Sequence, residues 1–176
     1  NEGGFFFTSN DHEELIVRKK ISQDGAIPSG NSVAALSLLR LGKLTGSDFL
    51  SDRGAETIRA FGQYLDRAPA AFHMMLVALD FYLDEPMEIA VVGDPDAEDT
   101  QAALRAVNAE FVPNKVLAFR SSSGRDDLGK KVPLLEGKTL VNGGAATYLC
   151  RNYACDLPIT DAAEVTERLR PAPKRE

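Results

Sequence analysis

The sequence lacks long apolar runs, a basic excess and a set of cysteines, and each absence excludes a class of protein. No apolar run approaches the ~20 residues that cross a bilayer, so we expect no membrane partner. The 20 basic and 26 acidic residues give a net charge of −6. This balance argues against nucleic acid as a partner, because phosphate binding needs clustered lysine and arginine. We interpret the short basic stretches Arg18-Lys19-Lys20 and Lys174-Arg175 as solvated ends.

Two cysteines are too few for a disulfide scaffold, so we expect a reducing, cytoplasmic compartment. The given residues begin Asn1-Glu2-Gly3-Gly4, without an initiating Met and without the basic start and apolar block of a secretory signal. We therefore expect a piece of a longer chain. Its 176 residues, 44% hydrophobic and 26% charged, suffice for a sizeable core.

Signatures of metals and cofactors are also missing. The two histidines, His12 and His73, lie far apart in the sequence, and a zinc site needs about four ligands. We expect His12 in a solvated loop and His73 as a packing residue. The turn Gly93-Asp94-Pro95 has a single glycine and acidic neighbours that would repel phosphate, so it does not predict a nucleotide site. We expect no metal and no cofactor.

Residues 1–86 are predicted to hold a leading β-hairpin and three helices. Gly4–Thr8 and Leu15–Arg18 are β-prone, with turn-forming residues between them. The first and third helices are apolar on nearly every side, whereas the second is amphipathic. Buried and outer helices alternate in this way in toroids of helical hairpins. The helices are expected over residues 30–44, 48–66 and 69–83.

The periodicity changes at Pro86, and residues 87–176 are predicted to form a small α/β appendage. A strand over 87–93, a helix over 97–109 and a strand over 115–120 imply a parallel strand pair. Further strands are expected over residues 139–142 and 146–150, and a last helix ends near residue 169. The fold class is therefore α+β.

The most informative stretch runs from Asp24 to Ser32, a polar loop that enters an apolar helix. Glycines allow close approach of a ligand, and a helix N-terminus favours anions or hydroxyl oxygens. The stretch predicts a site for a polar ligand such as a sugar, with Asp24 as a catalytic or hydroxyl-binding group. Ser29, Gly30 and Asn31 are the predicted ligand-binding residues. Alternatively, Ser29 and Asn31 are helix-start residues and Asp24 is a turn former.

Cys150 and Cys155 form a second candidate site. Their four-residue gap does not fit the two-residue redox pair of thioredoxins. Buried thiols and a local disulfide formed under oxidation both remain open. The pair is a redox candidate.

Six segments in order resemble the C-terminal part of the YyaL-like, spermatogenesis-associated thioredoxin-domain family. They are Gly3–Thr8, Leu15–Arg18, Asp24–Ala35, Leu76–Phe81, Pro113–Val116 and Cys150–Cys155. The resemblance implies a parent with an N-terminal thioredoxin-like domain and an (α/α) six-hairpin toroid similar to those of sugar epimerases and glycosidases. This chain would hold the last toroid helices and the terminal appendage, with the rest of the parent as its partner. Carbohydrate metabolism is attributed to the family largely by fold.

Three hypotheses follow. The chain is part of a carbohydrate-active protein of undefined reaction, whose loop from Asp24 to Ser32 lines a cavity. It is instead a redox-linked interaction module, in which Cys150 and Cys155 exchange with a thioredoxin-like domain. In the third hypothesis the appendage is purely structural.

Overall fold

The structure is a computed structural model that describes residues 3–11, 16–123 and 128–170. The chain divides into two compact units, Asn1–Asp84 and Glu85–Glu176. The expectations for His12, Leu15 and Lys174-Arg175 fall outside the described residues. Within the described part, no helix is both long enough and apolar enough to cross a membrane.

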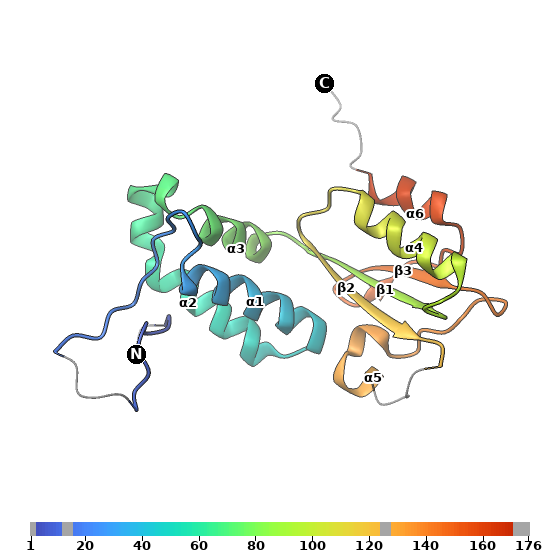
Figure 1. Ribbon diagram of the computed structural model, residues 1–176, viewed down its shortest axis with the longest axis horizontal. Helices are drawn as coiled ribbons and strands as arrows, with labels where there is room; N and C mark the ends of the chain where they lie inside the picture. Colours follow the sequence, from blue (N-terminus) through green and yellow to red (C-terminus); the bar gives the residue numbers. More distant parts are fainter. Residues whose placement is uncertain (1–2, 12–15, 124–127, 171–176) are drawn as a thin grey trace, which may run out of the picture. The chain divides into compact units, whose positions relative to one another are not determined.

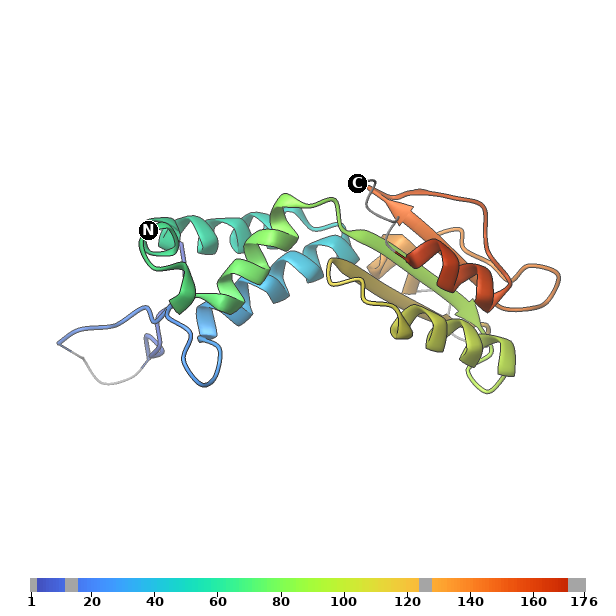
Figure 2. The ribbon, with the colours of Figure 1, turned by 90° about the horizontal axis from the view of Figure 1, so that it is seen from above.

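Three helices packed side by side build the first unit (Figures 1 and 2). The first helix begins after Ser29, whose Oγ accepts a hydrogen bond from Ser32 N at 3.1 Å. It ends at Gly46, whose φ of 64° is left-handed. Such local signals explain why the bounds of the first two helices were predicted closely. The third helix was expected to begin at Pro69, but it begins at His73, because residues 69–71 form a separate 3₁₀ turn. The elements are α1 (Gly30–Thr45), α2 (Asp48–Arg67), the 3₁₀ turn η1 (Pro69–Ala71) and α3 (His73–Leu83).

Within the first unit, the first and third helices leave apolar side chains exposed. On α1, Val33 and Leu41 are 41% and 47% exposed, and on α3 Val77 is 45% exposed. Each helix buries one face, because three mutually packed helices have no further layer to cover the other. His73 is exposed for a related reason, since it is the first residue of α3 and not an interior packing residue.

The leading segment differs from the predicted β-hairpin. Described residues 3–11 and 16–29 hold no strand, although a backbone hydrogen bond from Phe7 N to Lys19 O at 2.8 Å joins the two stretches. Gly3 and Gly4 have φ of 69° and 70°, which bends the chain out of the extended region. The backbone groups of Phe5 bond to a side chain of α1, so they do not enter a strand ladder.

A four-stranded sheet with the order β2-β1-β3-β4 forms the second unit. The predicted parallel pair is confirmed between β1 and β2, and β3 pairs antiparallel with β1. The strand expected over 139–142 is only an isolated bridge between Val141 and Gly144. The elements are β1 (Met87–Gly93), α4 (Glu98–Ala109), β2 (Lys115–Ser121), α5 (Leu128–Lys131), η2 (Pro133–Leu135), β3 (Ala146–Arg151), β4 (Ala154–Cys155) and α6 (Ala162–Leu169).

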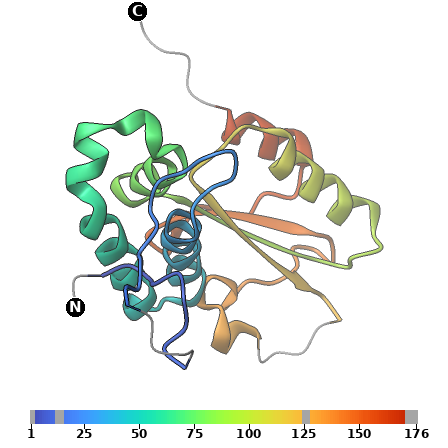
Figure 3. The ribbon, with the colours of Figure 1, turned by 60° about the vertical axis from the view of Figure 1, so that its left-hand side comes forward.

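Both faces of the central strand β1 are covered (Figures 1 and 3). Ile89 and Val91 pack with the apolar sides of α4 and α6. Because side chains alternate along a strand, Glu88 faces the opposite side of the sheet. Its side chain is fully buried at 0% exposure, which is unusual for a carboxylate. The described elements establish an α+β fold.

Candidate functional site

Asp24 is buried and bonded through both carboxylate oxygens. Oδ1 accepts from Ser29 N at 2.8 Å, and Oδ2 accepts from Met74 N at 2.8 Å and Met75 N at 3.4 Å. Burial acts to raise the pKa of Asp24, but these hydrogen bonds and one from Ser32 outweigh it and hold the pKa below its ordinary value. An ionised carboxylate thus stabilises the N-terminus of α3 and fixes the loop before α1.

The other predicted binding residues also stand at the start of α1. Ser29 caps the helix and is buried, while Gly30 has open space around it. Asn31 is 4% exposed and holds the leading segment. Its Oδ1 accepts from Phe5 N at 2.6 Å, and its Nδ2 donates to the carbonyls of Phe5 at 2.9 Å and Ile21 at 2.7 Å. Asn31 therefore positions the backbone of Phe5.

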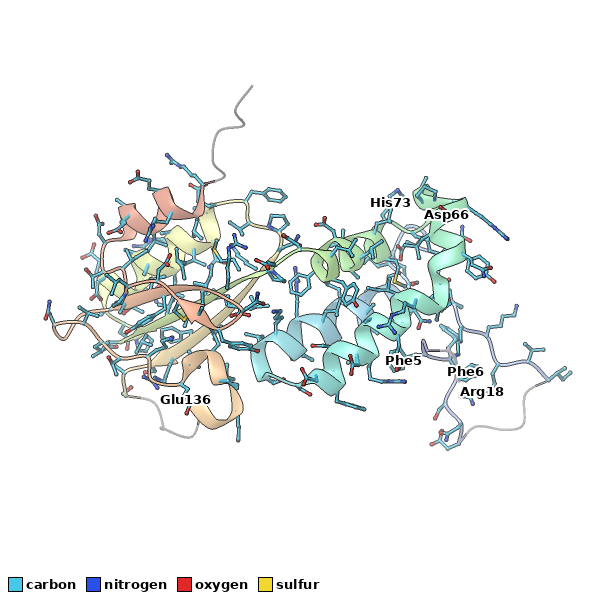
Figure 4. The ribbon with its side chains drawn as sticks, turned by 180° about the vertical axis from the view of Figure 1, so that it is seen from behind. Phe5, Phe6, Arg18, Asp66, His73 and Glu136 are labelled. Atoms are coloured by element: carbon cyan, nitrogen blue, oxygen red, sulfur yellow. A yellow bond between two sulfur atoms is a disulfide. The ribbon has the colours of Figure 1, made fainter. Side chains whose placement is uncertain are left out.

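Phe5 belongs to a hollow of about 390 Å³ that the leading segment forms with α2. We call it the leading-segment hollow. Its aromatic rings come from residues 5–6, and its cations come from residues 18–20 and from Arg53 on α2. Phe5, Phe6 and Arg18 lie near one another in Figure 4. Its lining consists of Gly3, Gly4, Phe5, Phe6, Thr8, Ser9, Asn10, Arg18, Lys20 and Arg53.

Cations contact aromatic rings on this lining. The Arg18 guanidinium lies 4.3 Å and the Lys20 ammonium 4.8 Å from the centre of the Phe6 ring. Arg18 also donates to the Thr8 carbonyl at 2.7 Å, and Lys20 donates to the carbonyl of Gly3. These contacts fix the positions of Arg18 and Lys20 relative to the Phe6 ring.

A buried hydroxyl adds a polar group to the lining. Thr8 Oγ1 has no hydrogen-bond partner among the described residues. Buried polar atoms in proteins are almost always bonded, to protein or to water. A bound water or a ligand oxygen at the lining would satisfy this hydroxyl.

Sequence reasoning missed the leading-segment hollow. It treated Phe5 and Phe6 as strand residues and Arg18 and Lys20 as part of a solvated end. The available signal was the pair Gly3-Gly4 directly before aromatic residues, because adjacent glycines permit a sharp bend. A Cβ on Gly3 would overlap the carbonyl oxygen of Glu56 on α2, so the close approach depends on glycine.

The cysteine pair forms a disulfide within a hairpin. Cys150 on β3 and Cys155 on β4 are cross-strand partners and are covalently bonded. The sequence had left free thiols and a disulfide open. Between the strands, Asn152 and Tyr153 have φ of 47° and 61°, the conformation of a two-residue hairpin turn.

Glu88 supports this turn, and sequence reasoning missed it. Its Oε2 accepts from Tyr153 N at 2.7 Å, and Glu88 is the register partner of Cys150. A second hollow of about 310 Å³ lies beside the disulfide, with Arg168 and Asp156 among its lining residues. Over the described residues, no three His, Cys, Asp or Glu side chains gather as metal ligands.

Comparison with known proteins gives consistent matches. The chain is 37% identical over 171 residues to spermatogenesis-associated protein 20 of Rattus norvegicus and 35% identical over 173 residues to that of Homo sapiens. It matches a part of the spermatogenesis-associated protein 20 family. An uncharacterized protein of Caenorhabditis elegans is 28% identical over 168 residues.

These matches cover nearly all of the chain but a small part of each relative. They span 95–97% of the chain and 22% of the length of the three relatives named above. No family model and no solved structure matches the chain.

Proposed function

We propose that the chain is part of a carbohydrate-binding protein and that the leading-segment hollow holds the sugar. The observation that carries this proposal is the lining itself, in which two aromatic rings stand beside hydrogen-bonding groups. The apolar face of a sugar ring can pack on Phe5 or Phe6, while its hydroxyls bond to carbonyls and cations. The volume of about 390 Å³ lies in the range of ~300–1,000 Å³ typical of small-molecule sites.

In this proposal the residues singled out from the sequence act by positioning. Asn31 fixes Phe5, and Asp24 fixes Ser29 at the start of α1. Glycoside cleavage commonly uses two carboxylates beside the scissile bond. Among the described residues, the lining of the leading-segment hollow holds aromatic, cationic and hydroxyl groups, and we propose binding as the function of this part of the molecule.

The helices of the first unit fit a place in a larger helical assembly, and we propose the six-hairpin toroid. Val33 and Leu41 on α1 leave apolar surface exposed. The relatives are several times longer than this chain, which spans 22% of their length. Further toroid helices would bury this surface, at roughly 25 cal/mol for each Å² removed from water.

The test is a titration of the complete chain with neutral monosaccharides and oligosaccharides, followed by calorimetry and by NMR. Phe6→Ala removes one ring of the lining, and Phe111→Ala is the matched control because Phe111 is 84% exposed in the second unit. We expect Phe6→Ala to weaken sugar binding by about tenfold and Phe111→Ala to leave it unchanged. Absence of binding across the panel, or equal binding by both variants, would contradict the proposal.

A second candidate function rests on the disulfide. We propose that a thioredoxin-like dithiol reduces Cys150–Cys155, so that two electrons and two protons pass to these cysteines and the donor becomes a disulfide. The hollow beside the bond gives such a partner a place to dock. Alkylation and mass spectrometry after incubation with reduced thioredoxin should show two new thiols. A bond that stays intact under these conditions contradicts this candidate.

A further inference from the structure

Three cations line the leading-segment hollow of a chain whose net charge is −6. They are Arg18, Lys20 and Arg53. Arg53 is paired, since its guanidinium contacts the Glu56 carboxylate at 2.8 Å. The side chains of that pair are 38% and 43% exposed, so the pair adds little stability.

Arg18 and Lys20 face a different set of groups. Each bonds to a backbone carbonyl and stacks on Phe6, and neither makes an ion pair with a carboxylate in the described part of the chain. A carbonyl oxygen accepts a hydrogen bond but carries no full charge. The two positive charges therefore remain uncompensated by the described neighbours.

The two charges also lie close to each other. Both sit beside the same ring centre, at 4.3 Å and 4.8 Å, so they are separated by no more than about one Debye length (~10 Å). Like charges at this range repel each other, and an anion between them would relieve the repulsion. Guanidinium and ammonium groups are the usual ligands of phosphate and carboxylate in proteins.

We propose that the leading-segment hollow selects a sugar that carries an oxyanion, either a phosphate or a carboxylate. This inference rests on the proposed function and deepens it. Arg18 and Lys20 hold the anion, and the rings of Phe5 and Phe6 contact the sugar. The alternative is a purely structural role, in which both cations only stabilise the leading segment by donating to the carbonyls of Thr8 and Gly3.

The experiment compares four probes on the complete chain by calorimetry: glucose, glucose 6-phosphate, glucuronate and inorganic phosphate. We expect each anionic sugar to bind about tenfold or more tightly than glucose, and more tightly than inorganic phosphate. The preference should shrink as NaCl rises from about 50 mM to about 500 mM, because salt screens the charges.

Charge-removing variants separate recognition from structure. Arg18→Gln and Lys20→Gln keep hydrogen-bond donors but lose the charge, and we expect each to reduce the preference for the anionic sugars about tenfold. Lys19→Gln and Arg59→Gln are matched controls, because both residues are exposed and neither lines the hollow. Arg18→Lys keeps the charge and should retain part of the preference for the anionic sugars. It therefore tests the role of the charge even if Arg18→Gln does not fold.

Each other outcome is decisive. Equal affinity for glucose and for both anionic sugars overturns this inference and leaves the proposed function standing. Anionic sugars that bind no better than inorganic phosphate overturn both, since the sugar then contributes nothing. Absence of binding by every probe also overturns both. An anionic preference that both Arg18→Gln and Lys20→Gln leave intact also overturns the inference, because other residues then hold the anion.

Discussion

The side-chain amide of Asn31 satisfies both backbone polar groups of Phe5, which lies 26 residues earlier in the chain. Oδ1 accepts from the Phe5 N–H at 2.6 Å, and Nδ2 donates to the Phe5 carbonyl at 2.9 Å. The buried side chain of Asn31 thus forms the two backbone hydrogen bonds that a neighbouring strand would otherwise form with Phe5. This contact connects the start of α1 to the wall of the leading-segment hollow.

Asn31→Ala should free the leading segment. The change leaves the N–H of Phe5 and the carbonyl of Ile21 without their partner, at a cost of about 2–4 kcal/mol in the free energy of unfolding. We expect faster tryptic cleavage at Lys19 and Lys20 and weaker sugar binding. Asn108→Ala is the control, because Asn108 is exposed and its amide donates to the Leu104 carbonyl of the same helix. Equal cleavage rates in the two variants would contradict this account.

Asp24→Asn should destabilise the first unit. An amide offers one acceptor oxygen where the carboxylate offers two, so one of the amides of Ser29 and Met74 loses its bond. The expected loss is about 1–3 kcal/mol by urea denaturation. Asp66→Asn on the exposed end of α2 should change stability by no more than about 0.5 kcal/mol. Sugar affinity reduced with stability unchanged would instead assign Asp24 a direct role in binding.

Acid should weaken both units. Burial raises the pKa of Asp24, but hydrogen bonds lower it more, and the amides of Ala145 and Thr100 lower the pKa of Asp99. Because both folded-state values lie below the ordinary 3.8, the stabilisation is complete above about pH 5 and is lost as pH falls through 3.8 and below. Urea midpoints between about pH 2.5 and pH 6 measure it. In Asp24→Asn the acid-induced loss should be smaller; an unchanged profile in that variant would count against Asp24 as a source of the effect.

Gly3→Ala should disturb the leading-segment hollow. The new Cβ would overlap the Glu56 carbonyl, and the φ of 69° is unfavourable for alanine. We expect a loss of about 1–3 kcal/mol together with weaker sugar binding. Gly25→Ala is the matched control, since nothing lies within 4 Å of its added Cβ. If both variants behave like the wild type, the close approach of Gly3 to α2 does not occur in solution.

Reduction of the disulfide should have a moderate effect. Cys150 and Cys155 are five residues apart, and closing so short a loop stabilises a fold by about 2 kcal/mol in the chain-entropy account. The hydrogen bond from Tyr153 N to Glu88 remains, and the ladder of β1 with β2 does not depend on the bond. Amide exchange with and without reductant should show β1 protected in both states. Exchange of β1 amides on reduction alone would show that the bond holds the whole sheet.

The sequence predicted the local elements well, because their signals are local. Ser29 and Asp161 cap helices through their own side chains, and the apolar run of β1 marks a central strand. The parallel pairing of β1 with β2 followed from the helix between them. The polar loop from Asp24 was also recognised as a special feature from its composition alone.

Only the tertiary structure decided what that loop does. The carboxylate of Asp24 bonds to Met74, 50 residues away, and Asn31 bonds to Phe5 across 26 residues. No spacing rule connects such positions, because their meeting depends on how three helices pack and on where Gly3 and Gly4 turn the chain. Residue types thus determined that helices, strands and caps would form. The packing of distant segments determined which polar groups form hydrogen bonds within the protein and which remain available to a ligand.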